Sequence, residues 1–243
     1  MKKEENGYYC FNFMGTPIQI DISWENCFKN LKLEIEEIEE YLDKANSITP
    51  EKDDIFKVFG KPMGDIKVII LGQDPYYQKG IATGRAFEVK DYKNWCQPIN
   101  NTSLINIVKE LYSQNGGEKL SIEEIRNEIK LKRFDIASPD NIFNIWENNG
   151  VFLLNTSLTC EIDNPNSHKV FWQCFTKKII KEIAFHNKIA FWLLWGDEAQ
   201  KYRKLIEPYV EPKRIVETAH PATNNFVGSG TFRKVLKFCK VSE

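Results

Sequence analysis

The sequence has no apolar run long enough to cross a bilayer, and residues 1–7 lack the apolar segment of a secretory signal. We therefore expect a protein of the cytoplasm, or of the nucleus in a eukaryote, that does not bind membranes. The six cysteines are scattered and include no C-x-x-C pair, which argues against a disulfide framework and against a structural zinc site. We expect free thiols and no metal.

The motifs of several large enzyme classes are also missing. No serine stands in a G-x-S-x-G turn, and the sequence contains neither a P-loop nor an H-E-x-x-H motif. This disfavours an α/β hydrolase with an activated nucleophile, a P-loop enzyme and a zinc protease. The formal net charge of −1 is not typical of a nucleic-acid-binding protein, although a DNA-binding face needs only a local basic patch.

The length of 243 residues and the 42% hydrophobic composition suit one well-buried domain, residues 1–243. Four compact apolar runs predict buried strands, at 67–71, 151–154, 189–194 and 214–216. Helical patterns lie before and between them, at 31–42, 104–112, 140–146, 171–184 and 197–206, with a capped start at 121 and a Pro-initiated short helix over 49–59. We predict an α/β fold with a central four-stranded, mostly parallel sheet flanked by helices on both faces. The polar segment 113–138 is expected to be a surface elaboration.

Polar residues follow the predicted strands. Asp74 comes after the first strand, Asn155 ends the second and His220 follows the fourth. Each has an ordinary structural explanation alone, since Asp before Pro and Asn at a strand end are common in turns. Because ligands of parallel sheets bind beyond the carboxyl ends of the strands, we expect the three to surround one pocket. A carboxylate, an amide and an imidazole form a hydrolytic set without a nucleophile.

Seven segments in the same order resemble the motifs of family 1 uracil-DNA glycosylases. They are 72–76 (GQDPY), 84–87 (GRAF), 102–111 (TSLINIVKEL), 153–159 (LLNTSLT), 166–169 (NSHK), 193–196 (LLWG) and 220–221 (HP). The resemblance covers roughly residues 23–238 and implies a uracil-DNA glycosylase-like fold. It also implies excision of flipped-out uracil from DNA to leave an abasic site, in base excision repair.

The resemblance assigns the chemistry to two side chains. Asp74 would orient the water and stabilise the oxocarbenium-like transition state, and His220 would donate a hydrogen bond to uracil O2. The backbone amide of Gln73 would assist at the same oxygen. No cofactor is needed.

The resemblance also implies how the base is bound. Phe87 would stack on uracil, and the Asn155 carboxamide would pair with N3 and O4. Tyr76 would block the C5 methyl of thymine. DNA contacts would come from six further residues: Ser103, Ser167, His168, Gly196, Ala222 and Asn224. The expected partner is uracil-containing DNA, single- or double-stranded, bound by a monomer, and no protein partner is predicted.

The sequence departs from the family at three places. Tyr77 replaces the usual His beside the water site, and Asp197 replaces a Ser near a phosphate contact. The loop after His220 is shorter and carries Asn224 where the family has the Leu that wedges into the duplex. Phe226 could replace that wedge if the loop bends suitably. We therefore predict weaker flipping from intact duplex and a preference for single-stranded DNA.

Two alternatives stay open. The same fold could act on a different modified base, through the altered loop and Tyr77. The chain could also be a non-catalytic DNA-binding scaffold, which the weakened wedge, Asp197 and the near-neutral charge would suit.

Overall fold

The computed structural model describes residues 7–45 and 47–242. Its central sheet has four strands in the order β5 (Val151–Asn155), β4 (Val68–Gly72), β7 (Phe191–Trp195) and β8 (Ile215–Thr218). All three neighbouring pairs are parallel. The predicted α/β fold is therefore confirmed, and the sheet is wholly rather than mostly parallel.

The sheet is buried on both faces, which explains why its strands are apolar runs without alternation. Val68 and Ile70 of β4 belong to one hydrophobic cluster, whereas Ile69 and Leu71 belong to another on the opposite face. Each face is therefore covered by its own core.

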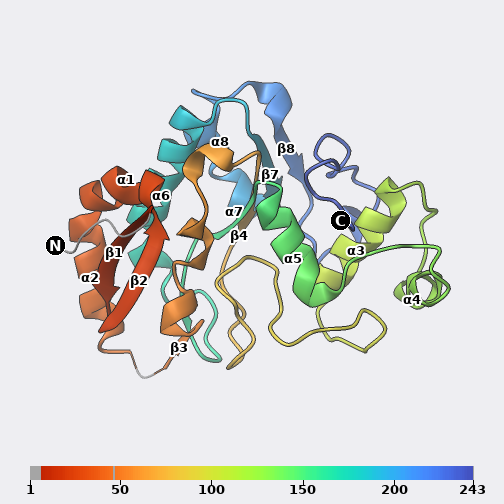
Figure 1. Ribbon diagram of the computed structural model, residues 1–243, viewed down its shortest axis with the longest axis horizontal. Coiled ribbons are helices and arrows are strands. Elements are labelled where there is room, and N and C mark those ends of the chain that lie inside the picture. The colour runs from red at the N-terminus through yellow and green to blue at the C-terminus, as the bar shows by residue number, and fades with distance from the viewer. Residues whose placement is uncertain (1–6, 46, 243) are drawn as a thin grey trace.

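The two cores are built by different parts of the chain (Figure 1). The core containing Ile69 holds side chains of α1 (Glu25–Asn30), α2 (Lys32–Leu42), α6 (Lys169–His186), α7 (Asp197–Gln200) and α8 (Arg203–Ile206). The core containing Val68 holds side chains of α3 (Thr102–Gln114), α4 (Ile122–Lys130), α5 (Pro139–Asn148) and the C-terminal segment. Figure 1 shows α1 and α2 at one end of the molecule and α3 and α4 at the other.

Segment 113–138 contains α4, which begins with the predicted capping box between Ser121 and Glu124. Ile125 of this helix is completely buried in the core of α3 and α5. The segment is thus tied to the main body by an apolar contact.

The structure differs from the predicted elements near the N-terminus. A hairpin of β1 (Tyr8–Phe13) and β2 (Thr16–Asp21) was not predicted. The predicted helix over 49–59 is wrong, because β3 (Ile48–Thr49) pairs with β6 (Cys160–Glu161) and only 3-10 turns follow. Those turns are η2 (Lys52–Asp54) and η3 (Lys57–Gly60); the others are η1 (Ile22–Trp24), η4 (Met63–Asp65), η5 (Pro212–Arg214) and η6 (Asn224–Phe226).

The predicted helix over 197–206 is divided into α7 and α8. The six cysteines are free thiols, as expected. Within the described part of the chain, none of the helices combines the length and the apolar character that a membrane crossing requires.

Candidate active site

The carboxyl ends of the four strands meet at one edge of the sheet. Gly72 of β4 lies beside Asn155 of β5, and Trp195 of β7 lies beside Thr218 of β8. The loops that leave these strands therefore start close together. This register brings Asp74, Asn155 and His220 to the same edge, as the sequence predicted.

Asp74 lies in a loop that is fixed by the neighbouring strand end. The N–H of Thr156 donates to the carbonyl of Gly72 over 3.0 Å, and the N–H of Ser157 donates to Gln73 over 2.9 Å. One carboxylate oxygen of Asp74, Oδ2, accepts the backbone N–H of Asn166. The other oxygen, Oδ1, is buried and has no hydrogen-bond partner among the described residues. It is therefore available to accept a hydrogen bond from a ligand.

Burial raises the pKa of the Asp74 carboxyl above its ordinary value. The N–H of Asn166 and the ammonium of Lys169 oppose this rise, because each favours the carboxylate. The pKa of Asp74 thus reflects a balance between burial, which favours the acid, and these neighbours, which favour the carboxylate.

His220 is held in one tautomer. Its Nδ1 accepts the backbone N–H of Ala222 over 3.1 Å, which leaves the ring proton of the neutral imidazole on Nε2. Burial lowers the pKa of His220, so the neutral form is favoured. Gly196, with a φ of 82°, allows this packing: a Cβ there would lie 2.7 Å from His220 Cβ. The result is a neutral Nε2–H donor at the edge of the sheet.

Phe87 and Tyr76 form an aromatic wall of this edge. The ring centroid of Phe87 lies 6.3 Å from that of His220 and 5.2 Å from that of Trp195. Phe87 has a positive φ of 67°, and its carbonyl accepts the Tyr76 hydroxyl over 3.3 Å. Burial raises the pKa of Tyr76 to about 12, so its hydroxyl keeps its proton.

Asn155 is 4% exposed, and its carboxamide packs so closely against position 72 that only glycine fits there. A Cβ at Gly72 would lie 2.3 Å from Asn155 Oδ1 and 2.8 Å from Ala86 Cβ. The N–H of Ala86 donates to the carbonyl of Leu153 over 3.0 Å, which ties the segment before Phe87 to β5. The carboxamide, the aromatic wall and the Asp74 loop are thus fixed against one another.

Comparisons with known proteins identify the family of this chain. The profile of the Uracil DNA glycosylase superfamily matches residues 59–239. The uracil-DNA glycosylase of Borreliella burgdorferi strain ZS7 is 36% identical over 236 residues, covering 92% of this chain and 95% of that protein. The chain belongs to the uracil-DNA glycosylase superfamily.

Other glycosylases of this superfamily match over most of their length. The uracil-DNA glycosylase of Borrelia turicatae strain 91E135 is 38% identical over 208 residues, which is 83% of this chain and 82% of that protein. The crystal structure of the wild-type UNG from Nitratifractor salsuginis superposes with a TM-score of 0.74 at 19% identity, covering 92% and 94% of the two chains. This structural likeness shows the shared fold.

The residues that a glycosylase would use to contact DNA divide into exposed and buried groups. Ala222 and Asn224 are exposed, and Ser103 is half-buried in the first turn of α3. Ser167 is also half-buried, and its hydroxyl accepts the N–H of Glu161 over 2.7 Å. These four residues are placed where DNA could reach them.

His168 and Gly196, for which DNA contacts were predicted, lie in the interior of the structure. His168 is completely buried, and its Nδ1 lies 2.9 Å from the hydroxyl of Thr159. Gly196 is also buried, and its N–H donates to the carbonyl of Thr218 over 2.9 Å. Both residues are thus enclosed by neighbouring protein groups.

Phe226 is not the replacement wedge. Its ring is completely buried and meets Trp195 edge-on at 5.1 Å between centroids. The exposed residues that precede Phe226 are Ala222, Thr223, Asn224 and Asn225, of which three are polar. The loop therefore presents no large apolar side chain.

Two residues of the site, Asn166 and Arg85, lie in motifs that the sequence analysis named, 166–169 and 84–87, but were given no role there. Asn166 contacts the Asp74 loop from a distant segment, and its position between Pro165 and Ser167 is a turn signal that could have indicated a fixed loop. The buried Arg85 pairs with Glu147 at 2.6 Å and with Glu88 at 3.1 Å. It anchors the segment before Phe87 to α5.

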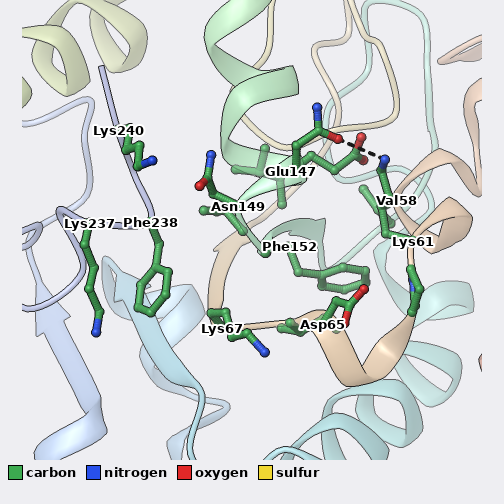
Figure 2. A pocket seen from close by; sticks show the side chains of 16 residues that line it. Val58, Lys61, Asp65, Lys67, Glu147, Asn149, Phe152, Lys237, Phe238 and Lys240 are labelled. Atoms are coloured by element: carbon green, nitrogen blue, oxygen red, sulfur yellow. Dashed lines mark hydrogen bonds between the residues drawn. The ribbon is translucent and has the colours of Figure 1, made fainter. Parts of the chain in front are cut away.

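A cavity of about 650 Å³ lies at the opposite edge of the sheet, beside the amino ends of β4 and β5 (Figure 2). Lys61, Asp65, Lys67 and Asn149 are among the residues that line it. It is separated from the Asp74 edge by the length of the strands and contains none of the predicted site residues.

Proposed function

We propose that the protein hydrolyses the N-glycosidic bond of uracil in DNA and leaves an abasic site, as in base excision repair. The observation that supports this most directly is that two groups lie at the same edge of the sheet. They are the Asp74 carboxylate, with a buried oxygen that lacks a partner among the described residues, and the neutral imidazole donor of His220. The named function of the relatives supports the same reaction.

Uracil must leave the base stack before it can react, at a cost of a few kcal/mol. Phe87 offers the flipped base a stacking surface, and such stacking contributes about 1–3 kcal/mol per base. Asn155 would pair with N3–H and O4 of uracil. Cytosine presents the reverse donor and acceptor pattern and would leave buried polar groups unpaired, which is costly.

Thymine differs from uracil only by a methyl group, so hydrogen bonds cannot exclude it. We assign the steric block to Tyr76. Its hydroxyl bond to the Phe87 carbonyl holds the ring against the stacking wall, which supports this role. Access of bases with larger C5 substituents should be blocked in the same way.

The bond between N1 and C1′ breaks as a water adds to C1′, and uracil departs as an anion. Asp74 would accept a hydrogen bond from that water through Oδ1 and stabilise the positive charge on the sugar. His220 Nε2–H would donate to O2, where negative charge develops, with help from the Gln73 backbone N–H. General-base assistance by Asp74 would raise the rate by about 10²–10⁴-fold. This chemistry requires no cofactor.

The DNA strand would contact Ser103, Ser167, Ala222 and Asn224. Because the tip of the loop is polar, we propose weaker flipping from duplex and a relative preference for single-stranded DNA. We also propose that residues 1–243 act as one monomeric domain, with 113–138 as a surface elaboration. Action on genomic DNA would place the protein in the cytoplasm of a bacterium or in the nucleus of a eukaryote.

Matched single- and double-stranded oligonucleotides containing one uracil test the proposal. Abasic products are cleaved with alkali and separated on a gel, with Asp74→Asn as the control. Cleavage that depends on Asp74 is the expected result. Absence of cleavage on both substrates would contradict the proposal, and a panel of modified bases would then distinguish a different base from a DNA-binding scaffold.

A further inference from the structure

Asn166 contacts Asp74, whose carboxylate is proposed to act in the reaction, and the side chain of the adjacent Gln73. It lies in the loop between β6 and α6, and its backbone N–H donates to Asp74 Oδ2. Its side-chain Oδ1 accepts the Nε2–H of Gln73. We propose that Asn166 is a positioning residue that orients the Asp74 carboxylate and the Gln73 side chain. This inference rests on the proposed function.

The backbone of Asn166 is suited to this double contact. Its φ of 66° lies in the left-handed region, which asparagine adopts more readily than most residues and which β-branched residues avoid. In this conformation the Asn166 N–H faces Asp74 and the Asn166 carboxamide faces Gln73. The residue type and the backbone are therefore matched.

The rest of the loop is held firmly against the site. The Ser167 hydroxyl accepts the N–H of Glu161 over 2.7 Å, and the N–H of Asp163 donates to the Tyr77 carbonyl over 3.0 Å. The N–H of Lys169 donates back to the Asn166 carbonyl over 3.2 Å. Because these hydrogen bonds fix the loop on both sides of Asn166, the loop can hold the Asp74 carboxylate in one rotamer.

The consequence for Asp74 is both geometric and electrostatic. The Asn166 N–H takes one acceptor position of Oδ2, whereas Oδ1 has no hydrogen-bond partner among the described residues and can accept a hydrogen bond from water. The same N–H favours the ionised carboxylate, against a burial that favours the acid. The other titratable groups that interact with Asp74 are Lys169, which favours its charge, and Cys160, whose thiol has a pKa raised by burial to about 12. Cys160 is therefore uncharged at neutral pH.

Two substitutions separate the two contacts. Asn166→Gly keeps the left-handed backbone and its N–H but removes the acceptor for Gln73. Asn166→Val removes the same acceptor and also disfavours the backbone conformation that directs the N–H to Asp74. Both variants lack the acceptor for Gln73, so the difference between them reports on the backbone conformation that directs the N–H to Asp74.

The pKa of Asp74 is read directly by ¹³C NMR titration of labelled aspartate carboxyls in the whole protein, with Asp74→Asn identifying the signal. We expect a higher midpoint for Asn166→Val and an unchanged midpoint for Asn166→Gly. The acid limb of the kcat/KM profile on a uracil oligonucleotide should shift in parallel. An unfolded fraction would lower the height of that profile but would not move its midpoint.

Equal Asp74 midpoints in the wild type and both variants would overturn the inference. For the second contact, Asn166→Gly and Gln73→Ala should each lower kcat, and the double variant should lose no more than either single one. Additive losses would contradict this part. An inactive wild type would contradict the proposed function, while the NMR titration would still decide the positioning role.

Discussion

The imidazole Nδ1 of His220 lies 3.1 Å from the backbone nitrogen of Ala222 and accepts its hydrogen. This bond joins the last polar residue of the β8 edge to the first exposed residue of the loop that follows. Protonation of Nδ1 would break it, because an imidazolium has no acceptor. The tautomer, the loop and the charge of His220 are therefore coupled.

Acid should destabilise the protein through His220. Burial holds the folded-state pKa of His220 below the value of 6.5 that applies to the unfolded chain. As the pH falls from 6.5 toward the folded-state pKa, the unfolded chain binds a proton that the folded chain does not, so the free energy of unfolding falls. Urea denaturation between about pH 5 and 8 should show a weaker decline for His220→Gln. The exposed His186 provides the control His186→Gln, and equal slopes for all three proteins would contradict the prediction.

Glycines at two strand ends should be irreplaceable. Gly72→Ala places a Cβ 2.3 Å from Asn155 Oδ1, and Gly196→Ala places one 2.7 Å from His220 Cβ. Displacement of a reacting group by about 1 Å can cost about 100-fold in rate, so we expect kcat/KM on a uracil oligonucleotide to fall by about that factor. Gly64→Ala is the control, because a Cβ there meets nothing within 4 Å. Full activity of the two site variants would refute the close packing.

An apolar residue at the loop tip should favour duplex substrates. Asn224→Leu adds a side chain that can cover the unstacked base pair, and partial burial of a Leu corresponds to roughly a tenfold gain in rate on duplex DNA. The rate on single strands should stay the same. Asn225→Leu, the same change at the next exposed position, is the control for general stickiness. Comparable single- and double-strand rates in the unmodified protein would contradict the proposed strand preference.

Loss of the Arg85 guanidinium should destabilise the fold. The side chains of Arg85, Glu88 and Glu147 are only 7%, 8% and 14% exposed, so Arg85→Leu leaves two carboxylates buried without their partner. Breaking a buried pair in this way costs about 3–5 kcal/mol. Chemical denaturation measures the loss, with Arg133→Leu, at an exposed ion pair with Glu128, as a control whose midpoint should hardly change. A small loss of unfolding free energy in Arg85→Leu would contradict the prediction, because it would mean that the structure around the two carboxylates relaxes.

The sheet could be predicted because its signal is local. Buried parallel strands are short apolar runs, and the four runs identified in the sequence became β4, β5, β7 and β8. The predicted helix beginning at Pro50 is wrong for the opposite reason, because the contact that decides the structure there is not local. Thr49 pairs with Cys160, a residue far along the chain, and this tertiary contact overrides the local capping signal.

The same distinction separates the parts of the site. The meeting of Asp74, Asn155 and His220 followed from the rule that parallel strands end at one edge. The burial of His168 and the contact between Asn166 and Asp74 could not be read in this way. Both depend on packing between segments that are distant in the sequence. Asn166 is 92 residues from Asp74, and the sequence offers only a turn signal for their contact.

The two halves of the site are supported from opposite layers of the molecule. Asp74 is held by the loop that leads into α6, whereas the carbonyl of Pro221, next to His220, accepts the side-chain amide of Asn106 in α3 over 2.7 Å. Local opening of either layer would therefore remove one of the two groups before the other layer melts. Heat inactivation would then follow whichever layer opens first, and the enzyme would pass from full to negligible activity without a half-active thermal intermediate.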